Sequence, residues 1–251
     1  MKKILLLLII IPKIGFGQIT ENFGFIPNWA GDYYTNWSVL GWSMDGYVAL
    51  LEIHEDDMFG GCSYSIIIQN MKTDKIVENY SLHSVGGLEP GDDDYEDYED
   101  YECDSVYVMG KYYDTETKKL FKKYKIIEND NNKFYKTSVV NNNYKIIFES
   151  KDAPVPDSLE ELDNYNGCEL YWCGNRPIDY SLTIKDSRNK SKILTKGTDW
   201  CASHIYYVGY FKSPFEPRLL MVIYSRESDA SQMYYSTYRF IGCSLNPSTF
   251  K

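Results

Sequence analysis

The densest group of chemically active side chains is an acidic run at residues 92–104, DDDYEDYEDYECD. It holds nine carboxylates and no base, so the chain's formal charge of −10 would be −1 without it. Carboxylates could ligate Ca²⁺, although no EF-hand spacing is present. Dense negative charge could instead steer a basic protein, or form a solvated loop because like charges repel. The candidate binding residues are Asp92, Asp93, Asp94, Glu96, Asp97 and Asp100.

Catalytic constellations are sparse. The histidines His54, His83 and His204 are scattered, and only His54 precedes acids that could orient a general base. Asp199, beside Trp200, could be one carboxylate of a glycoside hydrolase pair, but nothing in the sequence names its partner. Serine-hydrolase elbows, zinc-protease helices, P-loops and dinucleotide fingerprints do not occur. The sequence therefore names no catalytic residue and favours a protein that is not an enzyme.

The N-terminus has the layout of a secretory signal peptide over residues 1–17. Two lysines precede an apolar run at 4–11, and Gly15-Phe16-Gly17 places small residues before a cut at Gln18. The run is shorter than the ~20 apolar residues that span a bilayer. We expect export to the periplasm or the extracellular space, with residues 18–251 as a single β-rich domain. The alternative is a buried N-terminal strand.

The cysteines suit an exported protein, because an even number after such a leader predicts disulfides. Six cysteines allow 15 pairings, and we expect Cys62–Cys103, Cys168–Cys173 and Cys201–Cys243. A metal site at Cys168 and Cys173 is the alternative, but no histidine lies at the spacing that zinc sites use.

Most of the local patterns along the chain predict β-strands, which must position the residues named above. Short β-branched or aromatic segments lie at 47–53, 64–69, 105–109, 144–149, 180–184, 205–211, 218–224 and 234–241. One short helix is expected at 158–165, where Ser158 and Glu161 form a capping box. Residues 114–125 could be a second helix or a polar turn. Residues 86–104 form a polar insertion. These signals predict an all-β fold.

Adjacent aromatic residues recur along the chain, which contains 24 tyrosines. Neighbouring strand residues point to opposite faces, so one ring of each pair should be in the core and the other more exposed. An exposed ring suits stacking on a sugar or contact with a protein. The pairs are Tyr33-Tyr34, Tyr112-Tyr113, Tyr171-Trp172, Tyr206-Tyr207 and Tyr234-Tyr235.

Two short patterns occur twice. Residues 64–70 (YSIIIQN) resemble 180–186 (YSLTIKD), and Leu40-Gly41-Trp42 resembles Val208-Gly209-Tyr210. They indicate either an internal repeat or the chance similarity of apolar strands between polar turns.

The segment WSMDG at 42–46 predicts a tight hairpin, because Asp45-Gly46 tolerates positive φ. Together with the strands after it, over residues 37–82, it resembles one blade of a Tol-system-type β-propeller, with Asp74 where glycine is usual in the second turn. The resemblance implies a propeller-like meander of antiparallel blades, and a β-sandwich is the alternative. The whole-chain layout also resembles uncharacterised exported bacterial proteins, which implies no activity.

The net negative charge argues against a nucleic-acid or anionic-membrane partner. We therefore expect an exported, disulfide-braced binding or interaction module with a protein or glycan ligand and no obligatory cofactor. The alternatives are a cell-envelope hydrolase that uses carboxylates and a structural envelope protein.

Overall fold

The computed structural model describes residues 35–56, 61–85, 115–129, 132–154, 177–200, 202–228 and 234–250. The predicted signal peptide, the acidic run, the strand at 105–109 and the helix at 158–165 lie outside these ranges. Residues 114–125, which the sequence left open, form the helix α2 (Thr115–Tyr124). The other predicted strands are found. Among the described residues, no helix has the length and apolarity of a membrane span.

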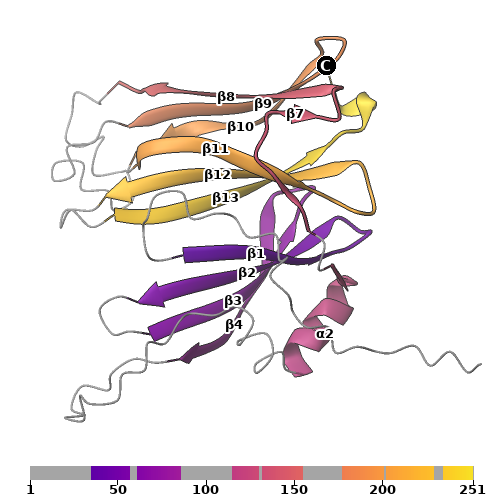
Figure 1. Ribbon diagram of the computed structural model, residues 1–251, viewed down its shortest axis with the longest axis vertical. Helices are drawn as coiled ribbons and strands as arrows, with labels where there is room; N and C mark the ends of the chain where they lie inside the picture. The colour runs from indigo at the N-terminus through magenta and orange to yellow at the C-terminus, as the bar shows by residue number, and fades with distance from the viewer. Residues whose placement is uncertain are drawn as a thin grey trace, which may run out of the picture.

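The strands form three antiparallel sheets (Figure 1). Sheet A has the order β4-β3-β2-β1-β5, comprising β1 (Thr35–Trp42), β2 (Tyr47–Asp56), β3 (Gly61–Asn70), β4 (Lys75–Val85) and β5 (Ile127–Glu128). Sheet B has the order β13-β12-β11-β6, comprising β6 (Phe134–Tyr135), β11 (Ala202–Lys212), β12 (Arg218–Ser228) and β13 (Tyr234–Ser244). Sheet C has the order β10-β9-β8-β7, comprising β7 (Val139–Val140), β8 (Tyr144–Asp152), β9 (Ile178–Asp186) and β10 (Ser191–Asp199). A short 3₁₀ helix, η1 (Pro247–Thr249), follows β13.

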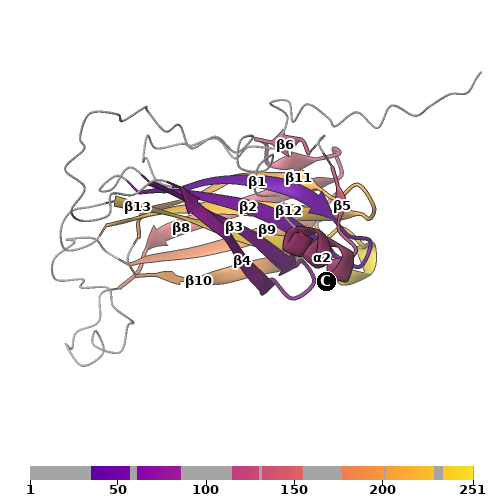
Figure 2. The same cartoon turned by 90° about the horizontal axis from the view of Figure 1, so that it is seen from below.

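The sheets stack in the order A–B–C, with sheet B in the middle (Figure 1). Trp42 and Leu50 of sheet A pack against sheet B, whose opposite face packs on Leu182 and Ile184 of sheet C. Helix α2 covers the remaining face of sheet A through Phe121 (Figures 1 and 2). The apolar side chains thus fill two interlayer cores and a third beneath the helix.

The stack confirms the all-β class and agrees with a sandwich that has a third layer. The expected propeller arrangement is wrong for the described residues, because the sheets lie face to face and not around a channel. The reason lies in β12, where every side chain from Leu219 to Ile223 is buried. A strand that is apolar on both faces needs a covering layer on each side.

The predicted hairpin is present between β1 and β2. Ser43 N–H donates to the carbonyl of Tyr47, and Gly46 has φ +90°. In the second turn, Asp74 takes φ +58°, a conformation that usually favours glycine. Strands β1 to β4 form a continuous antiparallel meander over the segment compared with a propeller blade. The family resemblance itself stays a prediction.

The chain between α2 and β8 connects the three layers. It adds β5, β6 and β7 to the edges of sheets A, B and C in turn. Asn132 is buried along this path, where its side chain accepts from Trp42 Nε1 at 2.5 Å and donates to the Val39 carbonyl at 2.7 Å. A buried amide that is satisfied on both sides fixes the position of the segment.

Candidate functional site

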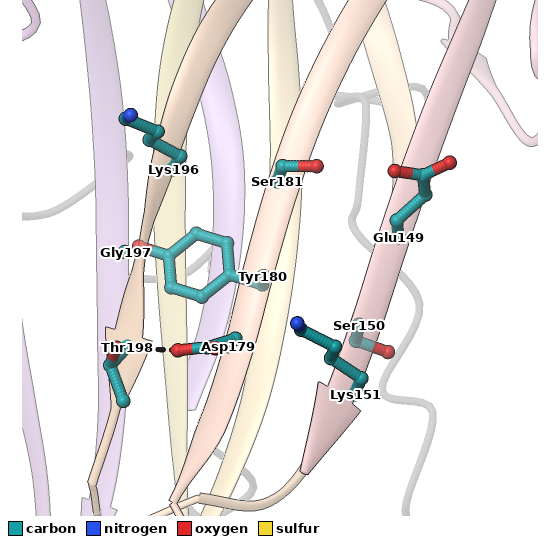
Figure 3. A pocket seen from close by; sticks show the side chains of 9 residues that line it. All are labelled: Glu149, Ser150, Lys151, Asp179, Tyr180, Ser181, Lys196, Gly197 and Thr198. Carbon is teal, nitrogen blue, oxygen red and sulfur yellow. Dashed lines mark hydrogen bonds between the residues drawn. The ribbon is translucent and has the colours of Figure 1, made fainter. Parts of the chain in front are cut away.

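Sheet C, the layer farthest from helix α2, carries a groove of about 690 Å³. Three neighbouring strands supply its nine lining residues (Figure 3). They are Glu149, Ser150 and Lys151 of β8, Asp179, Tyr180 and Ser181 of β9, and Lys196, Gly197 and Thr198 of β10. None of them was predicted as a site residue from the sequence.

The strand register arranges these residues in cross-strand rows. Glu149 lies opposite Ser181, which lies opposite Lys196. Two residues further along β8, Lys151 lies opposite Asp179, which lies opposite Thr198. Side chains alternate along a strand, and Phe148 and Leu182 pack on sheet B. The odd-numbered residues of β8 and β9 therefore point to the outer face.

The groove combines two carboxylates, two ammonium groups and hydroxyl groups. Thr198 Oγ1 donates to Asp179 Oδ1 at 2.7 Å. Within the described part of the chain, Glu149, Lys151 and Lys196 have no hydrogen bond or ion pair. Charged groups without partners on an open surface are available to a ligand.

Beneath the groove, Tyr180 and Gly197 form a cross-strand pair. A Cβ on Gly197 would lie 3.4 Å from the Tyr180 hydroxyl, so the ring lies against the glycine. Arg239 of β13 donates to that hydroxyl at 3.0 Å and to Asp199 Oδ2 at 2.7 Å. Burial lowers the pKa of Arg239, but Asp199 and Tyr180 outweigh this effect and raise it. The ion pair links sheets B and C below the groove.

Asp199, which the sequence suggested as a glycosidase carboxylate, belongs to this link. Its side chain is only 4% exposed, and its second oxygen accepts from the Ala202 amide at 3.2 Å. A buried carboxylate held by an arginine and an amide cannot reach a substrate at the surface. This environment does not favour the role in glycoside hydrolysis that the sequence left open for Asp199.

One predicted aromatic pair lies on described side chains and behaves as expected. Tyr206 is 49% exposed, whereas Tyr207 is partly buried against the core between sheets B and C. Tyr206 stacks on His204, with 5.9 Å between ring centroids, and on Tyr224 at 6.4 Å. The exposed rings of this aromatic platform, His204 and Tyr206 of β11, are a second candidate contact surface, separate from the groove.

Among the described side chains, the structure does not bring the histidines together. His54 is exposed at the end of β2, whereas His204 is on β11 in another sheet. The side chain of His83 lies outside the described part of the chain. Among the described residues, no group of three or more His, Cys, Asp or Glu side chains is placed to hold a metal ion.

The other predicted binding residues cannot be placed. Asp92, Asp93, Asp94, Glu96, Asp97 and Asp100 lie outside the described residues, as do Cys103, Cys168, Cys173 and Cys201. Cys62 lies in β3, with its side chain outside the described part. Cys243 is a buried free thiol, and burial raises its pKa to about 12. Five cysteines then remain, enough for at most two disulfides within one chain.

The register also argues against the expected Cys201–Cys243 pair. Ala202, the chain neighbour of Cys201, pairs with Glu227, which pairs with Tyr235. Cys243 lies eight residues beyond Tyr235 along β13. At roughly 3.3 Å per residue, these two residues are about 26 Å apart. A disulfide joins Cα atoms roughly 4.4–6.8 Å apart. The predicted Cys201–Cys243 disulfide is therefore wrong, while Cys62–Cys103 and Cys168–Cys173 stay predictions.

Comparison of the chain with protein-family models, with curated proteins and with solved structures finds no match. The groove must therefore be interpreted from its own chemistry.

Proposed function

We propose that this protein is an exported binding module that holds a small, hydroxyl-rich ligand, a saccharide, in the groove of sheet C. The observation that carries the proposal is the pair of cross-strand rows in which carboxylates, ammonium groups and hydroxyls are neighbours. Sugar hydroxyls both donate and accept hydrogen bonds. A surface that alternates acceptors and donors therefore suits a sugar.

The orientation of the two carboxylates supports binding over hydrolysis. Glu149 and Asp179 point away from each other in Figure 3, and Asp179 is directed toward Thr198. Hydrolysis of a glycosidic bond by paired carboxylates needs both groups to flank one bond. The divergent arrangement suits separate contacts along a bound ligand.

The composition of the groove supports a saccharide over a protein partner. The cores of protein interfaces are enriched in aromatic residues, methionine and arginine, and depleted in Lys, Glu, Asp and Ser. The outward positions of the groove are occupied by Lys, Glu, Asp, Ser and Thr. Tyr180, its aromatic residue, packs against Gly197 and Arg239 beneath the surface.

A glycan array probed with the mature full-length protein tests this proposal. Ser181 lies at the centre of one row, so Ser181→Trp should block the groove without changing its charge. Thr183→Trp is the matched control, two residues along the same strand and outside the groove. We expect saccharides that bind the wild type and Thr183→Trp but not Ser181→Trp. No binding to any saccharide, or equal binding to Ser181→Trp, would overturn the proposal.

A further inference from the structure

The charges of the groove are not mixed evenly, and their placement points to a narrower class of ligand. Lys151 lies directly opposite Asp179, so these two opposite charges are neighbours. In the other row, Glu149 and Lys196 are separated by Ser181. That row therefore has a negative end, a hydroxyl in the middle and a positive end.

The separation follows from the sheet geometry. Neighbouring strands lie about 4.8 Å apart, so the backbone positions of Glu149 and Lys196, two strands apart, are about 10 Å apart. Glu149 and Lys196 have no hydrogen-bond or ion-pair partner within the part of the chain that the structure describes. In Figure 3 both side chains extend away from the centre of the groove. Each can therefore meet a different part of one ligand.

We infer that the saccharide bound in the groove is zwitterionic, with a cationic group at Glu149 and an anionic group at Lys196. This inference rests on the function proposed above. A neutral sugar would leave both charges unmatched, and a sugar of one sign would meet repulsion at one end of the row. An amino sugar linked to a uronic acid carries both groups on one short chain. Sugar hydroxyls between them would contact Ser181.

Four matched oligosaccharides test the charge requirement by calorimetry on the mature full-length protein. The zwitterionic probe is de-N-acetylated heparosan, in which glucosamine alternates with glucuronate. N-acetylated heparosan is the anionic probe, chitosan the cationic probe and chitin the neutral one. We expect the zwitterionic probe to bind most tightly, and more weakly as salt increases, because exposed charges are screened.

Two single variants identify the ends of the site. Glu149→Gln and Lys196→Gln should each weaken binding of the zwitterionic probe by up to about fivefold, as expected for exposed charge pairs. Lys145→Gln is the control, an exposed lysine on β8 outside the groove, and should bind as the wild type does. The double variant with Glu149→Lys and Lys196→Glu should regain affinity, because the ligand can bind in the opposite direction.

The outcomes separate the two proposals. If chitin or a probe of one charge binds as tightly as the zwitterion, and Ser181→Trp abolishes that binding, the charge inference is overturned while the saccharide site stands. If the double swap binds no better than either single variant, the pairing of these two charges is wrong. If none of the four probes binds, the inference is overturned, and the glycan array alone decides whether a saccharide site exists.

Discussion

Asp199 and Asp179 show how neighbouring strands give the same side chain different roles. Asp199, at the end of β10, is buried and paired with Arg239, whereas Asp179 faces the groove and accepts from Thr198. The sequence drew attention to Asp199 because of the adjacent tryptophan. The groove residues carried a weaker signal, an alternation of charged and hydroxyl side chains in three separate strands. They become a site only through the register, which local patterns do not specify.

Glu52 gives a residue-scale prediction about pH. Burial raises the pKa of this half-buried carboxyl, and the neighbouring His54 partly opposes the shift. The folded state therefore binds the proton more readily than the unfolded state does. Stability is favoured below the unfolded pKa and falls as pH rises through the higher folded pKa.

Glu52→Gln should therefore raise the melting temperature at pH 7, and the difference from wild type should vanish below about pH 4. The gain in unfolding free energy should stay below about 1 kcal/mol, because the carboxyl is partly exposed. Thermal denaturation at both pH values measures it. Glu149→Gln, at an exposed position, is the control with little expected effect. An unchanged or lower melting temperature for Glu52→Gln at pH 7 would contradict the burial argument.

At the scale of elements, the β3–β4 turn holds sheet A against the outer edge of β13. Asp74 Oδ1 accepts from the Gly242 amide at 2.6 Å, and the buried Gln69 side chain donates to the Phe240 carbonyl at 2.6 Å. These bonds cap backbone groups on an edge strand, which would otherwise be open to pairing with another chain. The contact also requires a glycine, because a Cβ on Gly242 would lie 2.0 Å from the Met71 carbonyl oxygen.

Gly242→Ala should lower the unfolding free energy by about 1–3 kcal/mol or more, because backbone atoms would have to move. Gly197→Ala is a matched control in another edge strand, where the new Cβ would meet the Tyr180 ring at ordinary contact distance. It should change stability by less than about 1 kcal/mol. Urea denaturation of both variants measures the difference. Equal effects of the two substitutions would show that the β3–β4 turn does not pack closely against β13 at Gly242.

Element prediction succeeded where a strand is apolar and failed where its side chains are polar. Strands such as β2 and β12 have continuous apolar segments, whereas the edge strands β4 and β10 are largely polar and were not among the predicted strands. The repeated Gly41 and Gly209 motifs gain a physical explanation. Both glycines follow a register shift in their strands, and a Cβ at either would lie 2.5–2.6 Å from the segment that adds β5 or β6.

At the scale of the whole molecule, local patterns encode hairpins but not the order in which sheets stack. A propeller blade and a sandwich sheet both contain an antiparallel meander like that over 37–82. The sequence of this segment therefore could not distinguish the two folds. The decisive signal was β12, which needs cover on both faces. After sheet A, the chain adds only the short strand β6 to sheet B, forms all of sheet C, and then returns to form the three long strands of sheet B between them. No local motif contains that long-range order.

The cysteines provide a whole-molecule prediction. Because Cys243 is a buried free thiol and five cysteines remain, each chain should contain at least one more cysteine outside an intrachain disulfide. Mass spectrometry after alkylation in denaturant, without reductant, counts the free thiols. For the proposed exported form, the measured mass should be that of a chain that begins at Gln18. Three intrachain disulfides would contradict the structure, and a chain beginning at Met1 would contradict export.

The claim that sheet C binds the ligand is tested most directly by hydrogen–deuterium exchange of the mature protein with and without the strongest saccharide from the array. We expect ligand-dependent protection in peptides covering 149–151, 179–181 and 196–198. Protection confined to the aromatic platform around His204 and Tyr206, with none in the three groove segments, would contradict it.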